Sequence, residues 1–202
     1  MTQVRTRRLL LRPLRPADFS SFKDVRGRCH SWLTKWEPRR PAGSPDPATD
    51  SAAFATRCAA RERERQLGTG YAFGVFVGEE FAGEINVNNV VRGAFQSGHV
   101  GYWVDEKFAG QGVTPEGLVG VFGFVFDQVG LHRLEIAIIP RNAASLRVVE
   151  KLAIRREGQS ARYLEIDGIW EDHVRFGITA EEWQARRDEL TERHLTGTRA
   201  RR

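Results

Sequence analysis

Apolar residues along the chain follow two spacings, and the change between them divides the sequence into strands and helices. Alternating or continuously apolar stretches predict strands at residues 6–11, 71–77, 81–91, 100–104, 134–139, 162–166 and 169–178. Apolar residues three or four apart predict a short helix after Pro16, longer helices at about 51–67, 114–129 and 142–152, and a last helix from about Thr179.

The residues between these elements set their order. Asp50 or Ser51 suits the start of the helix at 51–67 and Gly68 its end, and Asp167-Gly168 predicts a hairpin between the last two strands. Four prolines between residues 38 and 47 predict an irregular loop. Consecutive strands from 71 to 104, followed by one strand–helix–strand crossover, indicate an α+β fold with a mixed, mostly antiparallel sheet of about seven strands.

The length of 202 residues fits one domain with a core of its own, which we assign to residues 1–192. Hydrophobic residues make up 41% and charged residues 28%, as in a soluble globular protein. The longest apolar runs are too short to cross a membrane, and Arg12 interrupts the first one, so no signal peptide is expected. Cys29 and Cys58 show neither disulfide nor metal spacing, which favours the cytoplasm.

The net charge of +5 is concentrated at one end of the chain. Removing Arg199, Arg201 and Arg202 leaves 5 − 3 = +2 for residues 1–198. We therefore expect residues 193–202 to be a disordered basic tail, and this tail alone is a candidate for weak contact with the ribosome or RNA. The charged run 61–65 is interpreted as a solvated helix face.

The run from Lys107 to Glu116 is the strongest candidate for a binding site. Gly110 and Gly112 allow a tight turn and close approach of the backbone to a ligand, while Thr114 and Pro115 suit a helix N-cap and first helical position. Free N–H groups at a helix start bind anions, and a pyrophosphate would fit. The alternative is an ordinary strand-to-helix turn, since the run is neither a Walker loop nor a dinucleotide fingerprint.

This run resembles the central motif of the GNAT N-acetyltransferases, with Lys107, Gly110 and Gly112 at the motif positions. Residues 140–152, beginning Pro-Arg-Asn-Ala-Ala-Ser, look like the family's second cofactor helix. The segments 36–38, 88–95 and 166–174 are similar to the Rim-type ribosomal-protein alanine N-acetyltransferases, and the similarity extends from about residue 5 to 185. The resemblance implies the GNAT fold, with helices on both faces of the sheet.

The resemblance also implies acetyl-CoA as cosubstrate, no metal, and direct attack of an amine on the thioester. The strand ending at Val104 would splay from the strand at 134–138, and the backbone of Trp103 and Val104 would pair with the pantetheine arm. The pyrophosphate-binding residues would be Gly110, Gln111, Gly112, Val113 and Thr114. Asn142 would bind the pantetheine arm and Ser145 would protonate the departing thiolate; the alternative is that both residues serve only to start their helix.

The general base is less evident. The place at which some Rim-type enzymes carry a glutamate is Leu164 here, and Glu165 beside it points to the other face of the strand. Glu84, Asn86 and Asn88 fall on one face of a predicted strand, which suggests a wall of the acceptor groove with Glu84 as base or amine anchor. The alternative is a strand face open to water.

Several aromatic and histidine residues are further groove candidates, although most such residues pack in cores or structural networks: Trp32, Trp36, Tyr71, His99, Tyr102, Trp103 and His173. Trp32 and Trp36 differ from the others because they precede the proline-rich loop, so at least one of them is expected to line the peptide site, and Trp36 is assigned to it. Gly117, Gly120 and Gly123 lie three apart in one helix, which predicts close packing of that helix on the sheet.

The leading hypothesis is an enzyme that acetylates a protein N-terminus, possibly of a ribosomal protein, as a monomer or homodimer without membrane contact. One alternative keeps the chemistry and changes the acceptor to a small amine or an antibiotic. The other is a non-catalytic acyl-CoA-binding or ribosome-associated protein.

Overall fold

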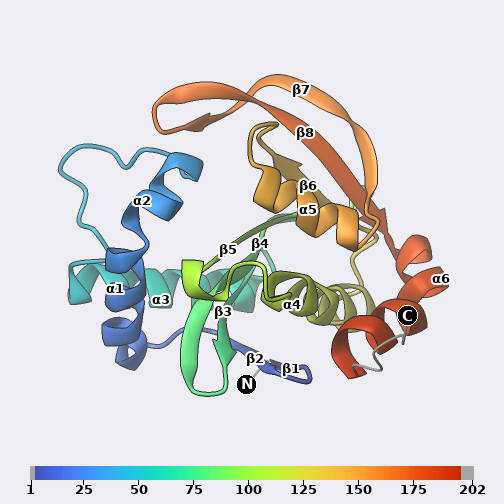
Figure 1. Ribbon diagram of the computed structural model, residues 1–202, viewed down its shortest axis with the longest axis horizontal. Helices are drawn as coiled ribbons and strands as arrows, with labels where there is room; N and C mark the ends of the chain where they lie inside the picture. Colours follow the sequence, from blue (N-terminus) through green and yellow to red (C-terminus); the bar gives the residue numbers. More distant parts are fainter. Residues whose placement is uncertain (1–2, 197–202) are drawn as a thin grey trace.

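The computed structural model describes residues 3–196, in which an eight-stranded sheet runs through the molecule (Figure 1). The order is β1-β2-β3-β4-β5-β6-β8-β7, and every neighbouring pair is antiparallel except β5 and β6. This confirms the α+β class with its mixed, mostly antiparallel sheet. The strands are β1 (Val4–Arg5), β2 (Leu9–Arg12), β3 (Tyr71–Val77), β4 (Glu80–Val91), β5 (Ser97–Val104), β6 (Arg133–Ile138), β7 (Arg155–Ile166) and β8 (Ile169–Thr179).

The sheet has one strand more than the seven predicted, because the segment predicted as the first strand forms a small hairpin of β1 and β2. The chain turns back after Arg5, so that Val4 pairs with Leu11, and the Thr6 side chain accepts the Leu9 N–H at 3.0 Å. The predicted strand at 162–166 is likewise longer than expected and begins at Arg155. Its first half shows no alternating pattern because β7 is an exposed edge strand whose register shifts between Ser160 and Leu164.

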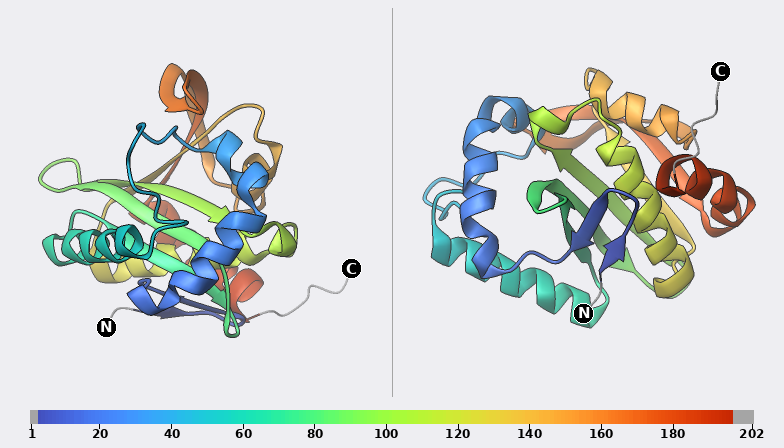
Figure 2. Two further views of the ribbon diagram at one scale, coloured as in Figure 1. Left: turned by 90° about the vertical axis from the view of Figure 1, so that its left-hand side faces the viewer. Right: turned by 60° about the horizontal axis from the view of Figure 1, so that its bottom comes forward.

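Helices cover both faces of the sheet, as the resemblance implied (Figure 2). One face carries α1 (Phe19–Arg28) and α3 (Ser51–Leu67), and their apolar side chains pack with Phe76 and Phe81 of the sheet. The other face carries α4 (Val113–Phe122), which continues as π-helical turns to Val129, together with α5 (Ala143–Lys151) and α6 (Ala180–Thr191). Between α1 and α3, the short helix α2 (His30–Leu33) leads into a 3₁₀ turn at Thr34–Trp36.

The strands β5 and β6 separate halfway along their length. They pair only at Ser97, Gly98 and His99 of β5, whereas β5 continues to Val104 and β6 to Ile138. Beyond His99 each strand therefore presents unpaired backbone groups towards the other. Unpaired backbone in the middle of a sheet requires a partner, which can be water or a ligand. The splay predicted for these two strands is present.

The glycines of α4 explain how closely this helix packs on the sheet. A Cβ atom at Gly117 would lie 2.6 Å from Cδ1 of Ile85, and one at Gly120 would lie 3.0 Å from Cγ1 of Val4. At Gly123 the nearest contact would be 3.6 Å, an ordinary distance. Close packing therefore explains why glycine is needed at positions 117 and 120. At position 123 a larger residue would fit, so packing does not explain the glycine there.

The helix starts match the sequence in most places. Asp50 accepts from the backbone N–H groups of Ala52 and Ala53 at the start of α3, and Gly68 ends that helix in the left-handed conformation, as predicted. The expected start of α4 is wrong by two residues. Gly112 is the N-cap, with φ of +78°, so Pro115 stands at the third helical position, where its missing N–H still has no intrahelical acceptor.

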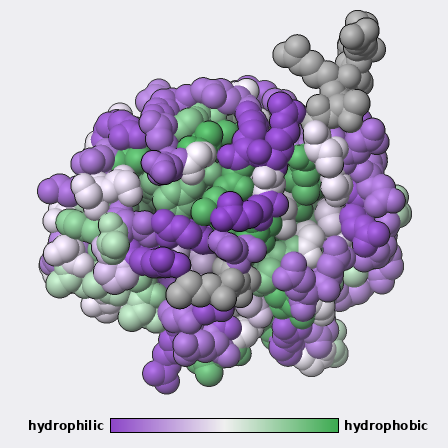
Figure 3. All heavy atoms as spheres, turned by 90° about the horizontal axis from the view of Figure 1, so that it is seen from below, coloured by the Kyte–Doolittle hydropathy of each residue, from purple (hydrophilic) through white to green (hydrophobic). Residues whose placement is uncertain are grey.

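The chain end differs slightly from expectation within the described residues. Residues Glu192–Thr196 continue the last helix as a π-helical turn, whereas the tail was expected to begin at 193; the rest of that tail lies outside the described residues. From residue 3 to 196 no helix has the length and apolar character needed to span a bilayer. Seen from below, hydrophilic residues surround a smaller apolar region near the middle of the surface (Figure 3).

Candidate active site

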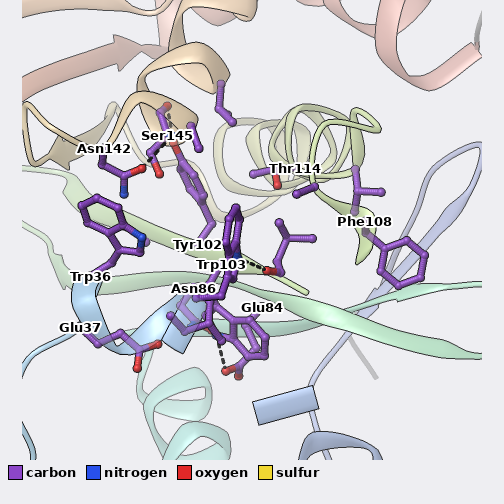
Figure 4. A pocket seen from close by; sticks show the side chains of 18 of the residues that line it. Trp36, Glu37, Glu84, Asn86, Tyr102, Trp103, Phe108, Thr114, Asn142 and Ser145 are labelled. Carbon is purple, nitrogen blue, oxygen red and sulfur yellow. Dashed lines mark hydrogen bonds between the residues drawn. The ribbon is translucent and has the colours of Figure 1, made fainter. Parts of the chain in front are cut away.

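A cavity of about 1000 Å³ lies along the part of β5 that has separated from β6. It is bounded by α1, the segment 32–38, one face of β4 and β5, and the starts of α4 and α5 (Figure 4). The structure brings nearly every residue assigned to the site to this one cavity. Those that line it are Trp36, Glu84, Asn86, Asn88, Trp103, Val104, Gly110, Gly112, Val113, Thr114, Asn142 and Ser145.

Gln111 is the exception among the assigned residues. It is exposed, does not line the cavity, and donates from its side chain to the carbonyl of Lys107 at 2.6 Å. Lys107 itself points away to Glu80 at 2.8 Å. Both side chains therefore shape the glycine turn from outside. The Gln111 backbone N–H donates to the carbonyl of Phe108 at 3.3 Å, so Gln111 is placed to hold the turn and not to contact a ligand as predicted.

The glycine turn is held by a residue that sequence reasoning missed. Arg8 donates to the carbonyl of Gln111 at 3.1 Å and pairs with the buried carboxylate of Glu116 at 2.7 Å. Glu116 lies in the first turn of α4, where an acidic side chain also complements the helix dipole. This contact ties the N-terminal hairpin to the turn, and no local pattern around Arg8 indicates it.

The glycines themselves are required by backbone conformation. Gly110 and Gly112 have φ of +75° and +78°, a region that other residues adopt with strain. A Cβ atom at Gly110 would meet no atom within 4 Å, and at Gly112 the nearest would be Nη2 of Arg8 at 3.6 Å. The turn thus leaves open space beside its backbone.

Two cations of α5 face the same part of the cavity. Arg147 and Lys151 lie one helical turn apart, both line the cavity, and neither has a carboxylate partner among the described residues. They add positive charge to the cavity lining, which suits a phosphate-bearing ligand.

The start of α5 places Asn142 and Ser145 at the cavity wall. The side-chain oxygen of Asn142 accepts from the Ser145 backbone N–H at 3.1 Å, so Asn142 is the N-cap of α5. Within residues 3–196 its amide nitrogen and the Ser145 hydroxyl have no hydrogen-bond partner. Both groups therefore remain able to contact a ligand, and the capping role of Asn142 does not exclude the predicted binding role.

Tyr102 of β5 supports the start of α5 through a hydrogen bond. Its hydroxyl donates to the carbonyl of Ser145 at 3.2 Å, which fixes the start of α5 on β5 (Figure 4). Burial raises the pKa of Tyr102 well above the usual value of a phenol, so the hydroxyl stays protonated and keeps donating even in alkaline solution.

The polar stripe of β4 forms the opposite wall. Glu84, Asn86 and Asn88 face the cavity, while Ile85 and Val87 between them are buried in the main core. The side-chain oxygen of Asn86 is buried and accepts no hydrogen bond from the described residues. Such an acceptor calls for a partner from solvent or from a ligand.

Glu84 is buried and already has partners. Each of its carboxylate oxygens lies 2.8 Å from Nη2 of Arg57 on α3, and the indole of Trp103 donates to it at 3.1 Å. The next turn of α3 supplies Arg61, which lines the cavity and donates to Asn88 at 2.9 Å. The interpretation of residues 61–65 as purely solvated is therefore wrong for Arg61.

The segment 32–38 forms the outer side of the cavity through two tryptophans. The indole of Trp32 donates to the carbonyl of Val104 at 3.2 Å, so one of the backbone groups expected to face the cofactor is shared with this side chain. Trp36 lies beside Asn142 (Figure 4), and the Arg141 guanidinium stacks over its ring at 4.9 Å.

The turn of the β7–β8 hairpin reaches this outer segment, as its arch in Figure 1 shows. The backbone N–H of Asp167 donates to the carbonyl of Glu37 at 2.9 Å, and Arg39 donates to the Asp167 carbonyl at 2.8 Å. On the same hairpin Glu171 accepts from Arg141 at 2.5 Å. These long-range contacts could not be found from the sequence.

Three other candidates do not line the cavity. Tyr71 packs edge-on against Phe124 of the core. His173 is buried with its Nδ1 3.0 Å from the Glu171 carbonyl. His99 lies 3.7 Å from Glu135, and burial lowers its pKa. Trp32, Tyr102 and Trp103 do line it.

The acetyltransferase (GNAT) domain family matches residues 8–155, most of the chain. The chain therefore belongs to the GNAT acetyltransferases. Its structure is similar to that of Mycobacterium smegmatis RimJ in complex with CoA-disulfide, with 30% identity, 95% of this chain and 92% of that chain covered, and a TM-score of 0.85. This confirms the resemblance to the Rim-type enzymes.

Two sequence relatives point the same way. The ribosomal protein uS5-alanine N-acetyltransferase of Escherichia coli is 28% identical over 183 residues, 90% of this chain and 92% of that protein. The probable N-acetyltransferase YjcK of Bacillus subtilis is 35% identical over 105 residues, 51% of this chain and 58% of that protein. The chain is thus an N-acetyltransferase by family, and its acceptor has to be argued from the site.

Proposed function

We propose that this protein transfers the acetyl group of acetyl-CoA to the α-amine of a protein N-terminus, with a ribosomal protein as acceptor. The observation that carries the proposal is that one cavity joins the free end of β5 and the glycine turn to the polar wall of β4. The relatives named for ribosomal-protein acetylation support the choice of acceptor. Such an acceptor places the enzyme in the cytoplasm.

The residues available for the acyl donor fit its chemistry. Acetyl-CoA supplies an activated thioester, two linked phosphates and a pantetheine arm with amide groups. The backbone at Gly110–Thr114, with Arg147 and Lys151, would bind the phosphates. The free backbone of β5 and the side chain of Asn142 would bind the pantetheine arm, as the unpaired strand edge suggests.

The reaction needs one bond formed and one broken. The acceptor amine attacks the thioester carbonyl carbon, a C–N bond forms, the C–S bond breaks, and the sulfur receives a proton from the Ser145 hydroxyl, which takes a proton back from solvent. The ammonium form of a peptide α-amine has a pKa near ~8, so the neutral nucleophile is accessible near neutral pH. Its proton passes to solvent at the cavity mouth.

Glu84 is assigned to positioning the amine. Its two oxygens already accept from Arg57 and Trp103, which favours the anchoring role of the two roles predicted from the sequence. Asn86, with its unpartnered oxygen, would accept a hydrogen bond from the same amine. Together they would present the amine within about 3–3.5 Å of the thioester carbon.

A panel of acceptors tests the proposal. Peptides beginning with Ala or Ser, which suit a confined amine site, are assayed with acetyl-CoA beside polyamines and aminoglycosides. We expect turnover of the peptides, and N-terminal mass spectrometry of cells with and without the gene should show the same acetylated terminus. Turnover of the small amines without any peptide would contradict the acceptor, and absence of all turnover with intact CoA binding would contradict the enzyme activity.

A further inference from the structure

Among residues 3–196, the cations that line the cavity near the segment 32–38, α3 and the start of α5, here called the acceptor side, are all paired with carboxylates except one. Each arginine has a partner within 2.8 Å: Arg26 with Glu37, Arg40 with Asp46, Arg57 with Glu84, Arg61 with Glu64 and Arg141 with Glu171. Lys35 lines the same cavity and, among the described residues, has no carboxylate partner. Among the described residues, the ammonium group of Lys35 is therefore the one positive charge on the acceptor side without a carboxylate partner.

Lys35 is held at a defined place. It lies in the 3₁₀ turn Thr34–Trp36, and its ammonium nitrogen is 5.7 Å from the ring centre of Trp32 and 5.4 Å from that of Trp36. Such distances allow cation–π attraction to both rings. Because the Trp32 indole is bonded to the Val104 carbonyl, the ammonium group is tied to the end of β5, where the strands have separated.

We infer that Lys35 recognises an acidic side chain of the acceptor, within the second to fourth residues after the reactive amine. The inference rests on the proposed function. An extended peptide covers ~3.3–3.6 Å per residue, so these positions fall within roughly 10 Å of the amine. An exposed, unpaired cation in the cavity lining attracts a carboxylate there and repels lysine or arginine at the same positions. It also disfavours polycationic amines as acceptors.

Charge-varied peptides test this inference. Octapeptides with an N-terminal alanine and Glu, Gln or Lys at the second, third or fourth position are compared by kcat/KM at low ionic strength. The wild-type enzyme should prefer Glu over Lys at one of these positions by roughly two- to fivefold, the size of a solvent-accessible ion pair. Raising the salt concentration should reduce this preference.

Variants of Lys35 distinguish the effect of its charge on acceptor preference from the effect of its packing. Lys35→Met should abolish the preference and Lys35→Glu should reverse it, with little change in thermal stability because the side chain is exposed. Lys23→Glu on the exposed side of α1 makes the same charge change outside the cavity and should leave the preference intact.

The outcomes distinguish the two proposals. Peptide turnover with the same charge ranking in the wild-type and Lys35→Glu enzymes would overturn the role of Lys35 and leave the N-terminal acceptor standing. Turnover of polyamines or aminoglycosides with no peptide turned over would overturn the acceptor assignment and this inference with it.

Discussion

The substitution Glu84→Gln separates an anchoring carboxylate from a general base. The change keeps the size of a buried side chain and one acceptor oxygen, and removes the negative charge opposite Arg57. Hydrogen bonds to charged groups contribute about 1.5–3 kcal/mol each, and one of them is lost. A domain of this length loses about 2–4 °C in melting temperature per kcal/mol, so we expect the melting temperature to fall by roughly 3–12 °C.

The kinetic effect is the decisive part. If Glu84 positions the amine, KM for the peptide should rise and kcat should fall by less than about tenfold, while CoA affinity measured by calorimetry stays unchanged. Loss of a general base typically costs ~10²–10⁴-fold in rate. A fall in kcat of a hundredfold or more, measured where chemistry limits the rate in a folded variant, would refute the anchoring role and restore Glu84 as the base.

A double-mutant cycle with Arg57 checks the structural premise. Arg57→Met alone leaves a buried carboxylate without its cation and should destabilise the protein by ~3–5 kcal/mol in urea unfolding. Adding Glu84→Gln removes that carboxylate charge, so the double variant should be more stable than the sum of the single changes predicts. Strict additivity would show that the 2.8 Å contact contributes no coupling.

Four further substitutions test the cofactor side and the core. Gly112→Val should abolish CoA binding in calorimetry, because a β-branched residue resists φ of +78°; unchanged affinity in a folded protein would contradict the cradle. Ser145→Ala should lower kcat, towards the smaller end of the ~10²–10⁴-fold range of acid catalysis, without weakening CoA binding; an unchanged kcat would leave Ser145 a structural residue. Gly117→Ala should destabilise by ~1–3 kcal/mol through the 2.6 Å approach to Ile85, whereas Gly123→Ala, with 3.6 Å of room, should be neutral or stabilising by up to ~1 kcal/mol; urea unfolding that ranks them the other way would contradict the packing argument.

Most of the fold could be predicted from the sequence because its elements have strong local signals. The alternation of β4, the helix end at Gly68 and the hairpin turn at Asp167-Gly168 each follow from short-range patterns, and the structure contains all three. The start of β7 was not predictable, since an exposed edge strand with shifted register shows no apolar alternation.

The parts of the site that lie within a single helix, strand or turn could be predicted from the sequence. The glycine turn, the start of α5 and the stripe on β4 are local features, and they converge on one cavity. The partners that hold them come from distant parts of the chain, as with Arg8 on the glycine turn and Arg57 on Glu84. A charged residue on a helix looks the same in sequence whether it faces solvent or a buried carboxylate.

The contacts of the outer segment together close a ring. Trp32 is joined to Val104, Glu37 to the turn at Asp167, and Glu171 of the same hairpin to Arg141 ahead of α5. The hydrogen bond from Tyr102 of β5 to the Ser145 carbonyl of α5 completes the ring. A ring admits a chain by its end far more readily than by its middle, because an internal lysine would have to bring two flanking segments through the same opening. Selectivity for chain termini over internal lysines would then follow from the closed shape of the ring, independently of which side chains the acceptor carries.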